Sequence, residues 1–206
     1  ATIDTGVVKV HRNLIQNSGD AITSSSFSSA LDLSADGALN SIITSDLDND
    51  GDLDIIVSST TAINVFKNTS VSGTISFDAK YVIPSSNSKQ VRIGDFNNDG
   101  LIDIVGFNST GFQIYKNNGS ITFDSPISFS SSSILGIESG DIDNDGDFDI
   151  ILSKSTSVEV WENDFSSGSF SLTKANTISS VGGDNLIFAD FDNDGDLDIY
   201  TKNWDL

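Results

Sequence analysis

Hydrophobic and polar residues alternate over short stretches of this chain. Runs such as TISFDAKYVI and SITFDSPISF place apolar side chains at alternate positions and are rich in Val, Ile and Phe. A period of two with this composition is typical of β-strands that bury one face. Ser- and Gly-rich turns separate the runs, and hardly any stretch favours a helix. The pattern predicts an all-β protein.

The strands are organised as a repeat. Acidic segments begin at Asp46, Asp95, Asp141 and Asp190, which gives a period of 46–49 residues. They read DLDNDGDLDIIV, DFNNDGLIDIVG, DIDNDGDFDIIL and DFDNDGDLDIYT. A short apolar stretch precedes each segment, and a second landmark (VFKN, IYKN or VWEN) follows the first three. Each unit offers four short strands, and such a unit is typical of a β-propeller blade.

The two ends of the chain carry complementary parts of one unit. The fourth unit ends at TKNWDL, before any counterpart of VFKN, and VKVHRN at residues 8–13 supplies that counterpart. We therefore expect residues 7–33 to complete the last blade with residues 186–203, which closes a ring and removes open sheet edges. The prediction is a four-bladed β-propeller of four-stranded antiparallel blades, built by residues 1–206 as a single domain. The alternative is a fragment of a longer array.

Each acidic segment follows the pattern D-x-[DN]-x-D-G-x-x-D. Positions 1, 3, 5 and 9 carry oxygen side chains, position 7 can add a backbone carbonyl, and Gly at position 6 permits a sharp bend. Oxygen ligands without His or Cys favour Ca²⁺ over zinc or copper, and Mg²⁺ prefers to keep its waters. A bound dication would offset the repulsion between these carboxylates. The alternative is a set of solvated acidic turns without metal.

The loops differ from an EF-hand in two respects. Position 12 lacks the Glu of an EF-hand, and the flanking segments are expected to be strands. The loops at 46–54, 95–103, 141–149 and 190–198 should therefore connect strands. Apolar residues at positions 2 and 8 are expected to bury each loop against its blade.

These loops, each placed between a short apolar strand and D-I, resemble the FG-GAP or VCBS repeats of integrin α-chain propellers and many bacterial secreted proteins. The resemblance covers essentially the whole chain, although that family's propellers more often have about seven blades. It implies four Ca²⁺ sites, one in each blade. The implied side-chain ligands, each set followed by its carbonyl donor, are Asp46, Asp48, Asp50 and Asp54 with Asp52; Asp95, Asn97, Asp99 and Asp103 with Leu101; Asp141, Asp143, Asp145 and Asp149 with Asp147; and Asp190, Asp192, Asp194 and Asp198 with Asp196. Because of Asn97 and Leu101, the second site should bind Ca²⁺ most weakly.

The composition restricts the partners and the compartment. A net charge of −20 disfavours nucleic acid and anionic membranes, because both would repel the chain. There is no Cys for a disulfide framework, and no apolar run approaches the ~18 residues that span a bilayer. A chain that begins with Ala and contains no Met suggests a removed signal peptide. We expect a secreted, extracellular protein.

The sequence carries no catalytic constellation. His11 is the single His, no G-x-S-x-G motif is present, and almost every clustered Asp is assigned to metal. We therefore expect a protein that is not an enzyme. The first functional hypothesis is a structural or adhesive scaffold that self-associates into a homo-oligomer, a polymer or a cell-surface layer.

The second hypothesis is a carbohydrate-binding module, because blade repeats give multivalent pockets. Its candidate aromatic residues are Trp161, Trp204, Tyr81, Tyr115 and Tyr200. Phe66, Tyr115 and Trp161 share one position in three repeats, and an aromatic residue repeated at a strand end more often packs within a blade than stacks on sugar.

Overall fold

The computed structural model describes residues 6–85, 87–165, 171–183 and 185–202, and β-strands dominate it. The middle of the chain forms three four-stranded antiparallel sheets, each with its strands in chain order. Their strands are β3 (Leu39–Ser45), β4 (Asp54–Ser59), β5 (Ala62–Phe66) and β6 (Tyr81–Pro84); β7 (Gln90–Gly94), β8 (Asp103–Phe107), β9 (Gly111–Tyr115) and β10 (Ile127–Ser130); and β11 (Gly136–Gly140), β12 (Asp149–Ser153), β13 (Ser157–Asn163) and β14 (Leu172–Ser179). The predicted all-β class and the four-stranded unit are confirmed.

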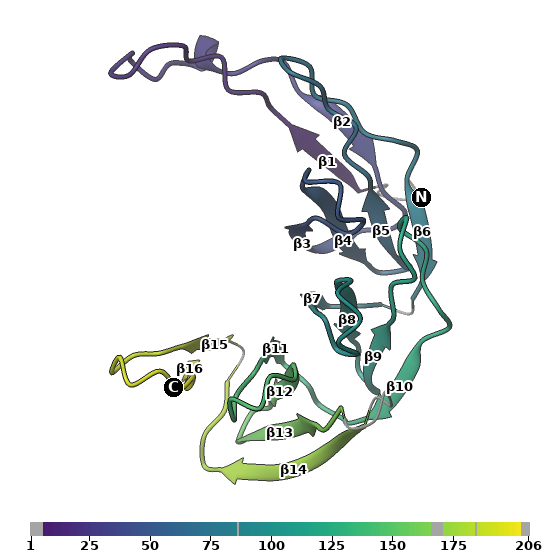
Figure 1. The fold of residues 1–206 in the computed structure, drawn as a ribbon, viewed down its shortest axis with the longest axis vertical. Helices are drawn as coiled ribbons and strands as arrows, with labels where there is room; N and C mark the ends of the chain where they lie inside the picture. Colours follow the sequence, from purple (N-terminus) through teal and green to yellow (C-terminus); the bar gives the residue numbers. More distant parts are fainter. Residues whose placement is uncertain (1–5, 86, 166–170, 184, 203–206) are drawn as a thin grey trace.

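Each end of the described chain forms a two-stranded sheet. Strand β1 (Val7–Val10) pairs with β2 (Leu31–Ser34), and β15 (Asn185–Ala189) pairs with β16 (Asp198–Lys202). A short 3₁₀ helix, η1 (Ser24–Ser26), lies between β1 and β2. The two hairpins lie at opposite ends of an open arc, one purple and one yellow (Figure 1). They are separate sheets in this structure, so closure of the ring by residues 7–33 and 186–203 stays a prediction, and residue 203 lies outside the described residues.

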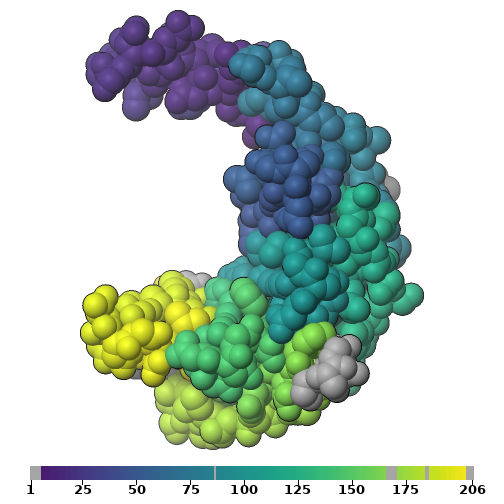
Figure 2. All heavy atoms as spheres, viewed as in Figure 1, coloured from purple at the N-terminus to yellow at the C-terminus, as the bar shows by residue number. Residues whose placement is uncertain are grey.

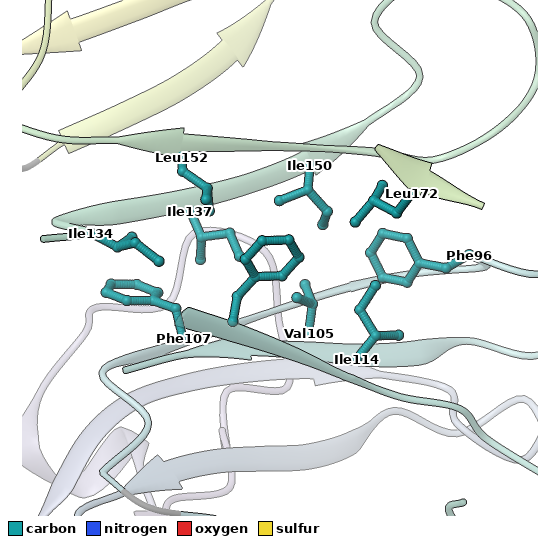
Figure 3. Packing of buried hydrophobic residues seen from close by; sticks show 10 residues of the cluster. Phe96, Val105, Phe107, Ile114, Ile134, Ile137, Ile150, Leu152 and Leu172 are labelled. Carbon is teal, nitrogen blue, oxygen red and sulfur yellow. The ribbon is translucent and has the colours of Figure 1, made fainter. Parts of the chain in front are cut away.

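Packing between neighbouring sheets explains the arc. The first strands of successive sheets lie next to one another, β3 by β7, β7 by β11 and β11 by β15. The second strand of each complete sheet is fully buried, which is why it reads as a continuous apolar run rather than an alternating one. The largest core lies between the second and third sheets (Figure 3) and contains Phe96, Val105, Phe107, Ile114, Ile134, Ile137, Ile150, Leu152 and Leu172. Because each sheet buries a face against the next, the chain extends as a stack of sheets.

The two hairpins are held by the same kind of packing. Val8 and Ala35 of the N-terminal hairpin region form a buried cluster with Ile55, Val57 and Phe66 of the first sheet. At the other end, Leu186 packs with residues of the third sheet. No helix within the described ranges is both long and apolar enough to cross a bilayer.

Candidate metal centres

The four acidic loops occupy equivalent places, between the first and second strands of each unit. In the first loop, the Asp46 carboxylate accepts the backbone N–H groups of Asp50 (3.1 Å) and Gly51 (2.9 Å). Equivalent bonds close the other three loops. Gly51 has φ 93°, a left-handed conformation that favours glycine, so position 6 has the role expected from the sequence.

Three of the loops bring carboxylates together closely enough to share a cation. In each, three acidic residues offer oxygens that all lie within 4.8 Å of one another. These groups are Asp46, Asp48 and Asp50; Asp141, Asp143 and Asp149; and Asp190, Asp192 and Asp194. Hard oxygen donors in such a group suit Ca²⁺. The residues present therefore fit a divalent cation, and the carbonyl ligands assigned to position 7 stay predictions.

The second loop differs in its chemistry. The side-chain amide of Asn97 donates a hydrogen bond to Asp99 Oδ2 at 2.8 Å, where the other loops carry a carboxylate. One fewer negative ligand, with a donor already bound to Asp99, weakens the attraction for a cation. Weaker Ca²⁺ binding at the second loop stays a prediction, and the contact between Asn97 and Asp99 gives it a physical reason.

Replacing Asn97→Asp should raise the Ca²⁺ affinity of the second loop by about tenfold, because loops of this kind set their affinity by the charge of their ligands. Isothermal titration of the variant and the native chain measures the change. Asn108→Asp adds the same charge outside the loop and should leave all affinities within about twofold. An equal gain in both variants would assign the effect to net charge rather than to ligation.

A lysine ammonium lies at the first loop. Lys67 Nζ contacts the carboxylates of Asp48 and Asp50, the latter at 3.1 Å. Hydrogen bonds from the Asp52 backbone and from Lys67 lower the pKa of Asp50, and the two carboxylates raise the pKa of Lys67. The first loop is therefore partly neutralised by the protein itself.

The position-9 aspartates tie each loop to its sheet. Asp54, Asp103 and Asp149 are fully buried, and both oxygens of each accept backbone N–H groups. One N–H comes from position 2 of the loop at 2.9–3.1 Å, and the other comes from the Asn that ends the second sequence landmark at 2.7–2.9 Å. Burial raises the pKa of Asp103 and of Asp149 to about 6. Position 9 is thus a structural anchor as well as a candidate ligand.

The landmark asparagines hold the acidic loops in place, a role that the sequence reasoning missed. Asn117 is buried, and its side-chain amide donates to the carbonyl oxygens of Leu47 (2.7 Å) and Ile102 (3.0 Å). Asn163 makes the equivalent pair of bonds with Phe96 and Phe148. Each amide therefore joins its own loop to the loop of the preceding sheet. The signal was the repeated Asn in VFKN, IYKN and VWEN.

The asparagines at position 4 form a second set of links. Asn49 Nδ2 donates to the Gly100 carbonyl oxygen at 3.2 Å. Asn98 and Asn144 donate to Asp147 and Asp196 of the following loops, both at 2.6 Å. All four position-4 asparagines have positive φ, which Asn tolerates better than most residues. Successive loops are thus bonded to one another along the arc.

The expected burial of the apolar loop positions is only partly found. At position 2, Leu47 and Phe96 are fully buried between neighbouring sheets, whereas Phe191 is 63% exposed. At position 8 the prediction is wrong for Leu53, which is exposed. Position 2 packs against the next sheet along the arc, and no further sheet follows Phe191 among the described residues.

The aromatic residues proposed for sugar binding are divided between core and surface. Phe66 and Tyr115 are buried, and Trp161 packs edge-on against Phe112 with ring centroids 5.1 Å apart. The repeated aromatic position thus serves packing in these sheets. Tyr81 and Tyr200 are exposed, and Trp204 lies outside the described residues.

Comparisons with known proteins agree with the repeat. A family model described as FG-GAP-like repeat matches residues 46–106, 95–152 and 141–201. A chain in a structure of the Photorhabdus luminescens Tc holotoxin pore is similar in fold, with a TM-score of 0.50, 17% identity and 77% of this chain covered. This chain spans 8% of the length of that toxin chain. The search of curated proteins found no match. From the repeated loops and the three matched segments, this chain belongs to the FG-GAP-like repeat family.

Proposed function

We propose that this protein is a calcium-binding repeat scaffold that works outside the cell, without catalysis, by associating with copies of itself. The observation that carries the proposal is the recurrence of one acidic loop at four equivalent places, with three groups of carboxylates close enough to share a cation. Ca²⁺ suits these loops because it accepts many oxygen ligands in flexible geometry.

Four bound Ca²⁺ ions, one in each loop, are part of the proposal. They would hold the carboxylates of positions 1, 3, 5 and 9, with Asn97 in the second loop. Bound cations would also lower the self-repulsion of a chain with a net charge of −20, which otherwise opposes assembly. Association should therefore depend on Ca²⁺.

Completion of the fourth blade is the second part of the proposal. The hairpin β15–β16 corresponds to the first two strands of a sheet, and β1–β2 corresponds to the last two. Residues 7–33 thus have the strands that residues 186–203 need to form a β-propeller blade. An extracellular location is supported by the family, whose repeats are typically extracellular.

A non-catalytic role is supported by the chemistry of the site. The loop carboxylates face backbone N–H groups and one another, and His11 Nδ1 lies 2.9 Å from the Ser28 carbonyl oxygen on an exposed hairpin. Neither arrangement presents a base to a polarised substrate atom.

Carbohydrate binding is the second candidate function, and one observation favours it. The exposed Tyr81 ring lies 5.9 Å from the Phe123 ring between centroids, and both line a surface groove with Pro84 and Pro126. Exposed aromatic rings beside a groove suit stacking on the apolar face of a sugar.

Light scattering during a Ca²⁺ titration distinguishes the two functions. At micromolar protein and millimolar Ca²⁺, the scaffold should grow into oligomers that EDTA dissolves, whereas Mg²⁺ at equal concentration should have little effect. A strictly monomeric protein with saturable glycan binding, lost in Tyr81→Ala, would replace the scaffold with the carbohydrate-binding module.

A further inference from the structure

Residues that are buried wherever two neighbouring sheets pack together are exposed at the two ends of the arc. Four residues before each acidic loop stands an apolar residue of the first strand, and Val91, Ile137 and Leu186 are buried at this position. The fourth equivalent, Ile42, is 58% exposed. Each buried member lies in one cluster with the position-2 residue of the preceding loop, as Val91 does with Leu47. Ile42 lacks that neighbour within the described chain.

Phe191 is the opposite member of this missing pair. As the position-2 residue of the fourth loop it should meet the next sheet, yet it is 63% exposed. Ile187 and Tyr200 of the same hairpin are also exposed. At one end of the arc, Ile42 is exposed without a position-2 residue packed on it. At the other end, Phe191 is exposed without a first-strand residue to pack on. Figure 2 shows the two ends, purple and yellow, well apart on the open side of the arc.

The turn at the landmark asparagine, called here the asparagine corner, is also separated from the aspartate that it would anchor. Asn13 bridges Phe27 across its hairpin, as Asn68 bridges Phe77, and the side-chain oxygen of Asn13 accepts the N–H of Ile15 at 2.9 Å. Asn68 and Asn117 make the same local bond at the same distance. The N-terminal hairpin therefore contains a preformed corner of the kind that anchors a position-9 aspartate.

Asp198, the position-9 aspartate of the fourth loop, lacks a bond from an asparagine corner among the described residues. Its Oδ2 accepts the N–H of Phe191 at 2.9 Å, as in the other loops, but among the described residues no asparagine N–H reaches its Oδ1. The three equivalent aspartates are fully buried, whereas Asp198 is exposed. Asn13 is likewise exposed, although Asn117 and Asn163 are buried.

A groove beside β1 completes the picture. It is lined by Val7 and Val8 of β1, by Leu39 and Ile42 of β3, and by Val57 of β4. The described part of the chain leaves the β1 edge that faces away from β2 unpaired. In the complete sheets, this edge of the third strand is paired with the second strand. The groove thus lies where the first two strands of a blade belong.

We propose that the groove beside β1 binds the β15–β16 hairpin of a second copy of this chain, so that each junction between copies is a complete four-stranded blade. The inference rests on the proposed self-association and specifies its contacts. Phe191 of one copy packs on Ile42 of the next copy. The backbone N–H of Asn13 in that next copy donates to Oδ1 of Asp198 in the first copy. The contact is heterologous, so successive copies form an open filament unless the ends meet and close a ring.

The register of the junction follows from the complete sheets. Strands β4 and β5 pair Val57 with Asn64. Val57 lies three residues after Asp54, and Asn64 lies four residues before Asn68. The same offsets from Asp198 and Asn13 pair Thr201 with Lys9. A shift of one residue, to Lys202, would place the side chains on opposite faces.

Mixing two single-cysteine chains tests this junction, because the native chain contains no Cys. Lys9→Cys chains mixed with Thr201→Cys chains should form a disulfide-linked heterodimer under mild oxidation in millimolar Ca²⁺. A bond within one chain is impossible in this mixture. Lys9→Cys mixed with Lys202→Cys is the register control and should give at least fivefold less heterodimer. Equal yields would overturn the proposed register and junction.

Two further measurements separate the outcomes. A chain with both Lys9→Cys and Thr201→Cys should link into multimers, and a monomeric product with an internal disulfide would overturn the proposal in favour of closure within one chain. Asn13→Ala keeps the backbone N–H but removes the side-chain oxygen that accepts the N–H of Ile15 and so fixes this turn; it should weaken association at least tenfold, whereas Asn17→Ala, on the exposed loop, should not. Ca²⁺-dependent assembly without the heterodimer would overturn this junction alone, and absence of assembly would overturn the proposed function as well.

Discussion

Removal of Ca²⁺ should lower the melting temperature of this protein by at least about 10 °C. At free Ca²⁺ of about 1,000 times Kd, one site stabilises the folded state by about 4 kcal/mol, and for a chain of this size each kcal/mol corresponds to roughly 2–4 °C. Without the cation, each of three loops holds three carboxylates within 4.8 Å of one another. Thermal denaturation in excess EDTA, compared with millimolar Ca²⁺ and with millimolar Mg²⁺, measures the effect. An unchanged melting curve in EDTA would reject the metal assignment.

The pH dependence in EDTA provides a second readout of the same loops. Burial raises the pKa of Asp103 and Asp149 to about 6 in the metal-free fold, above the ordinary value of 3.8. Because the folded state then binds protons more tightly than the unfolded state, their contribution is fully present below pH 3.8 and is lost as pH rises through about 6. The metal-free protein should therefore melt at a higher temperature at pH 5 than at pH 7.5. In Ca²⁺ this gain should vanish, since protons compete with the cation for the same oxygens.

Replacing Asn117→Ala should lower the free energy of unfolding by about 3–5 kcal/mol. The change leaves the buried carbonyl oxygen of Leu47 and the partly buried one of Ile102 without their donor, and it opens a void between two sheets. Chemical denaturation in Ca²⁺ measures the loss of unfolding free energy.

The neighbouring Asn118 offers a matched control. Its side chain is exposed and donates one hydrogen bond to Asp124, so Asn118→Ala should cost less than about 1 kcal/mol. If the two variants lost equal stability, the amide bridge between loops would not be the source of the effect.

The sequence was sufficient for the repeat, the strand content and the position of the acidic loops. These features are local, since alternation, turn residues and the D-x-D-x-D-G pattern each act within about a dozen residues. The role of Asn117 was not accessible in this way, because its partner Leu47 is distant in the chain and the two meet only after adjacent sheets stack.

The arrangement of the two hairpins was also beyond local patterns. The match between VKVHRN and VFKN predicts a third strand at residues 8–13. The structure shows that β1 pairs with β2 as β5 pairs with β6, and completion of that blade stays a prediction. Which strand completes that sheet depends on the rotation between successive sheets, which the cores around Phe96 and Leu47 set. The exposure of Leu53 has the same origin, since it depends on which residues face a neighbouring sheet.

The bonds from three of the position-4 asparagines to the loops that follow them have a consequence for the proposed calcium binding. Asn49, Asn98 and Asn144 connect the four loops in a line, so a change of shape that a bound cation caused in one loop would be passed to the next. We therefore expect neighbouring sites in such an array to be energetically coupled, as the units of a solenoid are. The chain should therefore respond to calcium cooperatively, with occupancy rising over a narrower concentration range than four independent sites would give.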